Sequence, residues 1–599
     1  MRRIARFFLW LFATIGAAVV IGGVGAVLIA VYMPDEELPP RMVLTLDLRG
    51  GLVDNRSDDP FEQLRGGSPN YLRRSVGALD AARTDDRVDG LILRLHGDHL
   101  RMAHVQELRD AIAAFRESGK WASAHAATFG GVADYTAAAA TGEIWMRPSG
   151  TVNVTGVAIS FPHVKDVLST IGVEAQIEQR HEFKSAAETF TRNTMSAPAR
   201  VSWRAVAQSW FRQMTSELAT ARDMTEDRVR ELIDEAPHIG AAAAKNGLID
   251  KLDYWDGFAA AQRARANVDN GDEATTVSIH DYARTLEAEP ENPATRIALI
   301  HGVGEVMPIA AGTLYQRDAL AADRIAAAIR KLAMEQDIDG IILRIDSPGG
   351  AYGASDSVWR AVKYARGKGK RVVSSLGVVA ASGGYFVAMG ADRIVAQPAT
   401  LTGSIGVFGG KIVLSELWRK LGVNWEQIRV GAQAGMWSPH WPFEPGAQLR
   451  QRAILDHIYQ DFTEKAASDR GLDAAAIDAA ARGRVWTGVD AKRLGLVDRL
   501  GGLTTAVGEM RDLLKLAADA PVALVVRPAA RSPLEQALDV LKEGGSPFSA
   551  IEALVTSFYR EPGWEMGSWR RWAGSLVGGL SMRPAPVGVL QLPPYLVSP

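Results

Sequence analysis

One serine of this chain has neighbours that suit a catalytic nucleophile. Ser382 lies in VVAASGGYFVAMG, between small residues and a Gly-Gly pair that leads into an apolar segment. A serine hydroxyl becomes nucleophilic only when a base takes its proton. The chain has no Cys, and the next His after Ser382 is His440. Histidine is therefore not evident as the base, and an arrangement of the Ser–His–Asp type is disfavoured.

An internal duplication indicates where the base could come from. The segment DDRVDGLILRL, which begins at Asp85, aligns with EQDIDGIILRI, which begins at Glu335, so that corresponding positions are 250 residues apart. The same offset joins Tyr135 with Tyr385, Ile144 with Ile394, Pro148 with Pro398, Gly156 with Gly406, and Gly172 with Gly422. Farther on, KNGLIDKL repeats as RLGLVDRL at an offset of 248. We therefore predict two copies of one unit, at residues 41–270 and 296–520.

Each copy has lost a residue that the other retains. Val132 stands opposite Ser382, and Ala434 stands opposite Lys184 in FKSAAETF. The first copy thus keeps a lysine without the serine, and the second keeps the serine without the lysine. This pattern predicts one Ser–Lys site shared by the halves, with Lys184 as general base. Burial of Lys184 would supply the large decrease from the ordinary lysine pKa of about 10.4 that such a base needs.

Three further residues complete the expected site. The backbone N–H groups of Gly383 and Gly350 are candidate donors to the oxyanion that forms when a serine attacks a carbonyl. Gly350 ends the loop DSPGG, whose counterpart in the first copy, HGDHL, has no Gly-Gly pair. The hydroxyl of Ser404 in LTGSIG is placed to hold the lysine amine toward Ser382. From the local sequence, DSPGG could equally be a simple tight turn and Ser404 an ordinary loop hydroxyl.

Other kinds of site are less well supported. His96, Asp98 and His99 resemble metal ligands, but they occupy the altered copy of the Gly-Gly loop, which favours a solvated turn. We expect no metal and no cofactor. The formal net charge of -2 offers no excess of positive charge for nucleic acid, so no nucleic-acid partner is expected.

The pattern of strands and helices around these residues predicts the α/β fold class. Short β-branched runs such as GIILRI and RVVSSLG alternate with Ala-rich helical stretches, which indicates βαβ units around a largely parallel, buried sheet in each copy. Residues 200–235 and 446–482 are predicted to form helical extensions. A linker at residues 271–295 contains the polar segment EAEPENPATR, and residues 521–599 have no counterpart in the other half.

The N-terminal segment, residues 1–40, predicts a membrane anchor. Its uncharged apolar run, residues 7–33, has the length of a spanning helix. Arg2, Arg3 and Arg6 precede the run and acidic residues follow it, so the N-terminus is expected in the cytoplasm and the body outside. A cleaved signal peptide is the alternative, although its apolar core would be shorter.

With these motifs in this order on a duplicated chain, the sequence resembles the signal peptide peptidase A family, in the long bacterial form also called protease IV. The matching strings are FKSAAETFTRNTMSAPAR, DSPGG, ASGGYF, TLTGSIGVFGG and VWTGVDAKRLGLVDRLGG. The resemblance implies a tandem, duplicated Clp/crotonase-like fold and a homotetramer anchored on the outer face of the cytoplasmic membrane. It further implies peptide substrates, namely signal peptides left in the bilayer after their release from secreted proteins.

The resemblance also assigns roles to the candidate residues. Ser382 matches the nucleophile, Lys184 the general base and Ser404 the hydroxyl that orients the lysine, whereas Gly383 and Gly350 match the oxyanion donors. Two rival functions remain at this stage. One is a crotonase-like enzyme acting on acyl-CoA, and the other is a non-catalytic membrane scaffold in which the serine is a relic.

Overall fold

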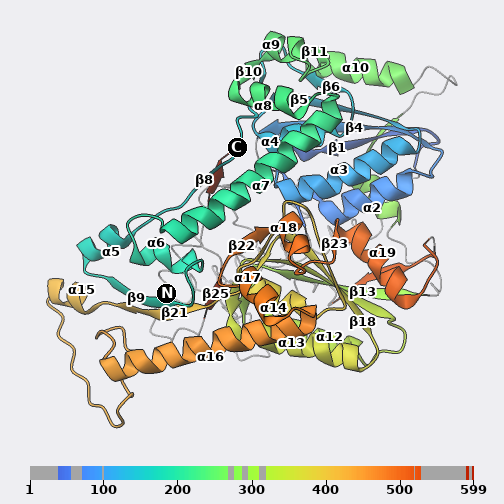
Figure 1. Ribbon diagram of the computed structural model, residues 1–599. Coiled ribbons are helices and arrows are strands. Elements are labelled where there is room, and N and C mark those ends of the chain that lie inside the picture. Colours follow the sequence, from blue (N-terminus) through green and yellow to red (C-terminus); the bar gives the residue numbers. More distant parts are fainter. Residues whose placement is uncertain are drawn as a thin grey trace, which may run out of the picture.

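Within the described residues, two large sheets with the same strand order form the body of the protein (Figure 1). The first has the order β10-β7-β5-β4-β1-β12, and the second has the order β22-β20-β18-β16-β13-β24. Their central strands β4 (Val88–Gly97) and β16 (Gly340–Ser347) pair in parallel with both neighbours and are buried for most of their length. Such strands read as continuous apolar runs because both faces are covered. The predicted α/β class and the duplication are confirmed.

The remaining strands of the two sheets correspond in sequence order. The first sheet contains β1 (Met42–Asp47), β5 (Trp121–Phe129), β6 (Ile144–Met146), β7 (Thr151–Val152), β10 (His238–Ile239), β11 (Lys251–Leu252) and β12 (Thr275–Ser278). The second contains β13 (Arg296–Val303), β18 (Arg371–Ala381), β19 (Arg393–Ala396), β20 (Leu401–Gly403), β22 (Val485–Thr487), β23 (Arg499–Leu500) and β24 (Ala523–Val526).

Helices cover the sheets, and all those given below except α11 have a counterpart in the other copy. The first copy contributes α2 (Leu72–Ala82), α3 (Met102–Glu117), α4 (Val132–Ala139), α7 (Ala197–Arg222), α8 (Glu226–Asp234), α9 (Gly240–Lys245), α10 (Trp255–Ala266) and α11 (Ile279–Leu286). The second contributes α12 (Ala322–Leu332), α13 (Tyr352–Gly367), α14 (Gly383–Met389), α16 (Pro445–Arg470), α17 (Ala474–Ala480), α18 (Gly488–Arg493) and α19 (Leu503–Leu514).

The predicted helical extensions are α7 with α8 and α16 with α17. Each of the long helices α7 and α16 has 26 residues and carries a proline in its first turn, where a missing N–H costs no intrahelical bond. Ser196 caps α7 by accepting a hydrogen bond from Ala199 N. In Figure 1, α7 runs along the side of both halves, and it contacts α4 of the first copy and β22 of the second.

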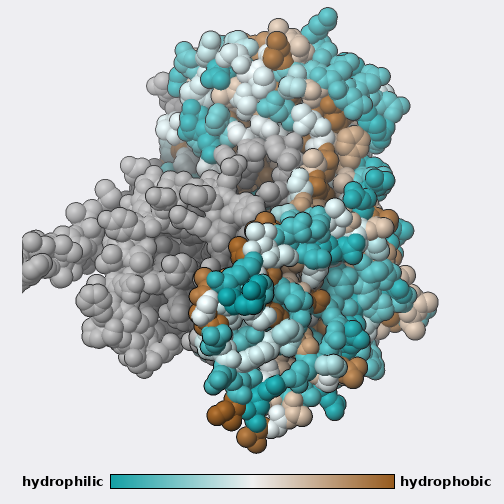
Figure 2. Space-filling view, turned by 90° about the vertical axis from the view of Figure 1, so that its left-hand side faces the viewer, coloured by the Kyte–Doolittle hydropathy of each residue, from teal (hydrophilic) through white to brown (hydrophobic). Residues whose placement is uncertain are grey.

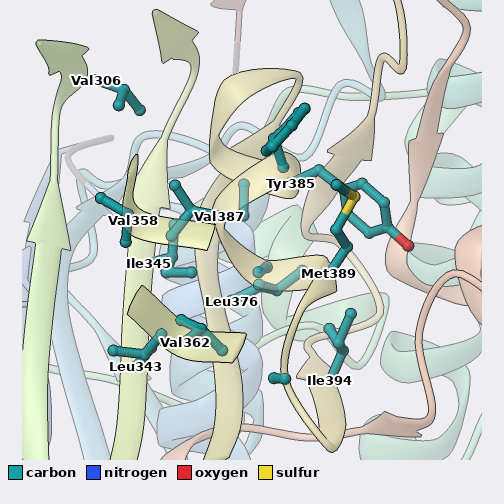
Figure 3. Close-up of a cluster of buried hydrophobic side chains, with 14 of the residues drawn as sticks. Val306, Leu343, Ile345, Val358, Val362, Leu376, Tyr385, Val387, Met389 and Ile394 are labelled. Carbon is teal, nitrogen blue, oxygen red and sulfur yellow. The ribbon is translucent and has the colours of Figure 1, made fainter. Parts of the chain in front are cut away.

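The duplication extends to individual hydrogen bonds. Tyr135 in α4 donates its hydroxyl to Leu248 O at 2.7 Å, and Tyr385 in α14 donates to Leu496 O at 3.0 Å. Figure 3 shows Tyr385 in the core of the second copy, where α13 and α14 pack on β16 and β18 through aliphatic side chains such as Leu343, Val362 and Leu376. This core fixes the position of α14 and therefore of the turn that precedes it.

A third sheet joins the two halves and is called the arm sheet below. Its order is β15-β14-β17-β25-β21-β9. Its members are β9 (Glu174–Gln179), β14 (Glu305–Met307), β15 (Ala319–Ala321), β17 (Gly349–Ala351), β21 (Phe408–Val413) and β25 (Val589–Gln591). A separate two-stranded sheet pairs β8 (Ala158–Ser160) with β26 (Leu596–Ser598). The short helices α5 (Lys165–Ile171) and α6 (Glu188–Thr191) contact β9, and α15 (Ser415–Lys420) follows β21 in the sequence. A small separate pair is β2 (Leu52–Val53) with β3 (Asn70–Tyr71).

The computed structural model describes residues 38–54, 70–97, 100–266, 275–286, 295–308, 319–518, 520–527, 589–591 and 596–598 of the chain. The apolar run at residues 7–33 and two members of the HGDH motif, Asp98 and His99, lie outside these ranges. Among the described residues, no helix combines the length and the apolar character that crossing a membrane requires. The described surface in Figure 2 is mainly hydrophilic, with apolar residues in small groups.

Pairing in the sheets runs past the copy boundaries expected from the sequence. Residues 275–286 of the expected linker form β12, which pairs with β1, and helix α11, which packs on the first core. β24, beyond residue 520, pairs with β13 of the second sheet. Two short stretches of the tail, β25 and β26, pair with strands of the body. The polar character of the linker did not reveal β12, which is a strand of four residues at the edge of the first sheet.

Candidate active site

Ser382 occupies a sharp turn between a strand and a helix of the second copy. β18 ends at Ala381 and α14 begins at Gly383. The φ of 56° and ψ of -113° at Ser382 lie in a region that residues with a side chain rarely adopt, and such strain is characteristic of functional positions. Its N–H donates to Gly403 O at 2.8 Å, which ties the turn to β20. A Cβ at Gly384 would lie 2.7 Å from Ser347 O, so this turn needs the small residues that follow the serine.

Lys184 belongs to the first copy, but strand pairing in the arm sheet places it against the second copy. β9 pairs antiparallel with β21 from Glu174 opposite Val413 to Gln179 opposite Phe408. The segment after β9 is then held by a hydrogen bond from Phe183 N to Arg482 O at 3.3 Å. Because β21 begins soon after Ser404 in the sequence, this pairing places Lys184 beside the loop that carries Ser404.

The structure brings Lys184, Ser382 and Ser404 together in the interior. Lys184 Nζ lies 2.6 Å from Ser382 Oγ, 3.0 Å from Ser404 Oγ and 3.0 Å from Ser404 O. Lys184 and Ser382 are each 0% exposed, and Ser404 is 1% exposed. The juxtaposition of a lysine from one copy with a serine from the other is the arrangement that the complementary losses predicted.

The environment of Lys184 favours its neutral form. Burial lowers the pKa of the Lys184 amine well below its usual value, and no carboxylate in the described part of the chain opposes that effect. A neutral amine has two N–H donors and one lone pair, and Nζ has three neighbours. Its N–H groups suit Ser404 O and Ser404 Oγ, which leaves the lone pair for the hydroxyl proton of Ser382. The geometry therefore suits a lysine that accepts a proton from the serine.

The two glycines predicted as oxyanion donors are neighbours. An ideal Cβ on Gly383 would lie 2.9 Å from Gly350 N, so the two backbones are in contact. Gly383 is the first residue of α14, where an N–H has no acceptor within the helix. A Cβ on Gly350 would lie 2.2 Å from Val306 O, which explains why the loop requires glycine there. DSPGG thus joins the end of β16 to β17 through Pro348 and is an immediate neighbour of the serine turn.

The positions that have lost their functional residues do not form a second site. Val132 is the first residue of α4 and packs against the first core, whereas its counterpart Ser382 stands in the turn just before α14. Ala434 is exposed in the segment between α15 and α16. His440 stacks on Trp425, with ring centroids 3.8 Å apart, and His181 packs on Tyr459 at 4.3 Å. Neither histidine has a hydrogen bond to Ser382 or Lys184 among those of the described residues.

Two further glycines that contact Lys184 were not among the residues predicted for the site. A Cβ on Gly483 would lie 2.5 Å from both Cβ and N of Lys184, and one on Gly406 would lie 3.2 Å from its Cδ. Gly406 belongs to the set that recurs at the 250-residue offset, so the repeat was the available signal for it. Gly483, in ARGRVW, carries no such signal because its role depends on a segment about 300 residues away.

Comparison with protein families places both copies in one family of peptidases. The model described as Peptidase family S49 matches residues 114–269 and 364–517, one stretch in each copy. A model described as Clp protease matches residues 313–400, which include Ser382. Together with the two repeated sheets, these matches confirm the Clp protease-like α/β fold expected from the sequence.

Several curated proteins are similar to most of this chain. Serine protease SPPA, chloroplastic, of Arabidopsis thaliana is 28% identical over 530 residues, which cover 87% of this chain and 76% of that protein. Protease 4 of Salmonella typhi is 30% identical over 508 residues and Protease 4 of Haemophilus influenzae (strain ATCC 51907 / DSM 11121 / KW20 / Rd) is 27% identical over 507 residues. In both of these, 80% of each chain is covered.

Proposed function

Because the chain belongs to peptidase family S49, it is a serine protease of the SppA type, and we propose that it cleaves peptide bonds with a Ser382–Lys184 dyad assembled from its two halves. The observation that carries this proposal is the distance of 2.6 Å between Lys184 Nζ and Ser382 Oγ, in a fully buried pair. The membership in a protease family leaves no support for an acyl-CoA enzyme or a non-catalytic scaffold.

The proposed reaction follows from the positions of the groups. Lys184 takes the Ser382 proton as Ser382 Oγ attacks the peptide carbonyl, and the resulting oxyanion accepts hydrogen bonds from Gly383 N–H and Gly350 N–H. The lysine then gives its proton to the leaving amine, and an acyl-enzyme remains. Water, activated by the same amine, hydrolyses the ester and regenerates Ser382. Ser404 holds the amine toward Ser382 throughout, and no cofactor takes part.

The dyad is tested by replacing each of its two residues. The control is a replacement at the position that the duplication places opposite Ser382. Ser382→Ala and Lys184→Ala should each lower kcat/KM for peptide cleavage at least 10³-fold, with circular dichroism and size-exclusion profiles unchanged. Val132→Ala, at the position opposite Ser382 in the first copy, should retain activity. An activated phosphonate should label Ser382 in the wild-type chain. Normal turnover by either dyad variant would refute this mechanism.

We further propose that the substrates are signal peptides left in the membrane and that residues 1–40 anchor the enzyme beside them, with the body outside the cytoplasm. The apolar run at residues 7–33 and the resemblance stated from the sequence support this proposal. Anchoring would raise the local concentration of membrane-bound peptide. Full-length enzyme in liposomes should cleave a co-reconstituted signal peptide at least tenfold faster than a chain lacking residues 1–40. Equal rates would contradict the role of the anchor.

A homotetramer is proposed on the resemblance alone. Multi-angle light scattering of the detergent-solubilised chain measures the mass directly, and a value of about one 64.5 kDa chain would contradict it.

A further inference from the structure

A cluster of polar side chains holds the segment that carries Lys184. Arg482 donates from Nε and Nη2 to the two carboxylate oxygens of Glu182, and both distances are 3.1 Å. The backbone N–H of Arg482 donates to the hydroxyl of Tyr459 at 3.2 Å, and its carbonyl accepts from Phe183 N–H at 3.3 Å. Glu182 lies in the first copy, two residues before Lys184, whereas Arg482 and Tyr459 lie in the second copy. Glu182, Arg482 and Tyr459 are called the support cluster below.

Each segment of this contact holds a residue other than glycine in the left-handed region. His181 has a φ of 63°, and Arg482 has a φ of 56°. Such a conformation is strained and persists only where the surrounding contacts fix it. The ring of His181 packs on the ring of Tyr459, with centroids 4.3 Å apart, and the ion pair and hydrogen bonds given above fix Arg482. The support cluster thus holds two strained positions beside the lysine.

On the first-copy side, the duplication associates these residues with the lysine. At the 250-residue offset, Glu182 corresponds to Ala432 and His181 corresponds to Gly431. Gly431 has a φ of 98°, so a left-handed residue occurs at this position in both copies, but glycine adopts that conformation without strain. The copy that lost the counterpart of Lys184 has therefore also lost the carboxylate and the imidazole that precede it.

On the second-copy side, the duplication associates the cluster with the serine. The helices α7 and α16 begin and end 248 residues apart, which gives the offset for this region. Tyr459 then corresponds to Phe211, which has no hydroxyl, and Arg482 corresponds to Asp234, which has the opposite charge. Phe211 packs against the apolar core of the first copy. The two copies therefore differ at the support cluster in the same complementary way as at the dyad.

The support cluster acts on the lysine through position and not through charge. Burial is the cause of the lowered pKa of Lys184, and the carboxylate of Glu182 is bound by Arg482. The residue after Arg482 is Gly483, whose added Cβ would lie 2.5 Å from Lys184 N. The contacts that fix Arg482 therefore also fix the backbone against which the lysine packs.

We propose that Glu182, Arg482 and Tyr459 are positioning residues, which hold Lys184 at hydrogen-bonding distance from Ser382 across the junction of the two copies. The inference rests on the proposed function, because it treats the lysine as the base of the reaction. All three residues act through the backbone of the lysine segment, so their loss should lower kcat and leave KM nearly unchanged.

Kinetics test the proposal with a matched control. Glu182→Gln, Arg482→Met and Tyr459→Phe should each lower kcat for peptide cleavage about tenfold or more, because a shift of about 1 Å in a catalytic group can cost about 10²-fold. The acid limb of phosphonate labelling should move to higher pH, since a less enclosed amine is more easily protonated. Arg429→Gln breaks the solvent-accessible ion pair with Glu444, in the second-copy segment that corresponds to β9, and should keep the original kinetics.

A double variant tests whether the ion pair acts as a unit. If Glu182 and Arg482 contribute through each other, the chain with both Glu182→Gln and Arg482→Met should be no slower than the slower single variant. Multiplied losses in the double variant would mean that the two residues act separately and would overturn the proposal. An effect of the single variants confined to KM would assign the cluster to substrate binding and would also overturn it.

Chemical modification reports the position of the lysine independently of catalysis. In the Ser382→Ala chain, acetylation of Lys184 by acetic anhydride, quantified by mass spectrometry, should be at least tenfold faster with Glu182→Gln or Tyr459→Phe than with Arg429→Gln. Unchanged acetylation, or unchanged kcat, in the cluster variants would overturn the inference alone. Cleavage retained by Lys184→Ala would overturn the proposed function, while acetylation would still decide whether the cluster positions the lysine.

Discussion

At the scale of single residues, the protonation state of Lys184 governs the proposed chemistry. Its pKa is lowered by burial, so the amine is neutral and able to act as a base at pH values where an ordinary lysine is charged. We predict that kcat/KM falls as the pH drops through this lowered pKa and that it does not require a pH near 10.5. A pH profile of phosphonate labelling, which reports the first step alone, checks this. Activity that appears only as the pH approaches 10.5 would contradict a buried, neutral amine.

The same burial should cost stability. Between the lowered folded-state pKa and the ordinary value of 10.5, the unfolded chain binds one more proton at Lys184 than the folded chain, so this group destabilises the fold and the effect diminishes as the pH rises. Lys184→Met removes the buried amine with little change of volume. We predict that it raises the free energy of unfolding at pH 7 by about 1–2 kcal/mol while abolishing activity. Urea unfolding at pH 7 and pH 10 measures the difference in free energy of unfolding between Lys184→Met and the original chain, and this difference should be smaller at pH 10. A variant less stable than the original chain at pH 7 would contradict the prediction.

Ser404 should act by holding the amine and not by touching substrate. Ser404→Ala removes the hydroxyl at 3.0 Å from Nζ but leaves the Ser404 carbonyl, also at 3.0 Å, as a partner. We therefore predict a partial loss of kcat, about 10- to 100-fold, with KM nearly unchanged and with a shifted pH profile of phosphonate labelling. Ser404→Thr, which keeps a hydroxyl, should recover part of the loss. An effect confined to KM would argue for a role in binding instead.

At the scale of elements, the site depends on how closely the Lys184 segment and the segment before β22 approach each other. Gly483 has a φ of 81°, and its added Cβ would lie 2.5 Å from Lys184 N and Cβ. Gly471, the C-cap of α16, has a φ of 65° with nothing within 4 Å of its Cβ. The two glycines therefore share the backbone strain that a side chain would bring, and they differ in their contact with the dyad.

We predict that Gly471→Ala destabilises the chain by about 1 kcal/mol from its positive φ, that Gly483→Ala destabilises it further because its Cβ would meet the backbone of Lys184, and that only Gly483→Ala impairs catalysis. Because a shift of about 1 Å in a catalytic group can lower the rate about 10²-fold, we expect a loss of that order in kcat/KM. Thermal unfolding and peptide cleavage, measured on both variants, separate the two effects. Equal activities would mean that Lys184 tolerates displacement.

The elements also explain how far the sequence could predict the site. Lys184 and Ser382 could be paired because duplication made position 132 a control for position 382 and position 434 a control for position 184. The pairing of β9 with β21 places Lys184 against the second copy. This pairing could not be predicted from the sequence because backbone hydrogen bonds are nearly independent of side chains. The same holds for β25, whose three residues pair with strands more than 150 positions earlier in the chain.

At the scale of the whole molecule, polar side chains of α3 hold the two copies together. Gln106 Oε1 accepts a hydrogen bond from Ala399 N at 2.8 Å, in the loop that leads to β20 and Ser404. Glu107 Oε1 accepts one from Leu503 N at 2.7 Å, at the start of α19. Gln106 and Glu107 thus belong to the first copy but bind backbone groups of the second. Their own counterparts in the second copy, at the 250-residue offset, are residues 356 and 357. The copy without the serine thus supports the loops of the copy that has it.

A buried arginine lies at the centre of this contact. Arg344 of β16 is 2% exposed, pairs with Asp54 at 2.7 Å and with Glu107 at 2.8 Å, and donates to Ser375 Oγ at 2.9 Å. Burial acts to raise the pKa of the Asp54 carboxyl, but the charge of Arg344 more than offsets this and holds that pKa well below its usual range. The carboxylate therefore stabilises the fold above the ordinary aspartate pKa, and this contribution is lost as the pH falls through the lowered one.

The duplication supplies a matched test of this contact, because Arg94 is the counterpart of Arg344 in the first copy. Arg94 is partly exposed, lies 4.0 Å from Asp47 and stacks on Trp255 at 4.1 Å. Arg344→Met leaves Asp54 and Glu107 buried without their cation, and we predict a loss of about 3–5 kcal/mol in the free energy of unfolding at pH 7. Arg94→Met should cost about 1 kcal/mol or less, since its ion pair and ring contact are solvated. Denaturant unfolding measures both, and the deficit of Arg344→Met should shrink in acid, where the stranded carboxylates can protonate. Equal losses for the two arginines would show that the contact between the copies rests on apolar packing and not on this cluster.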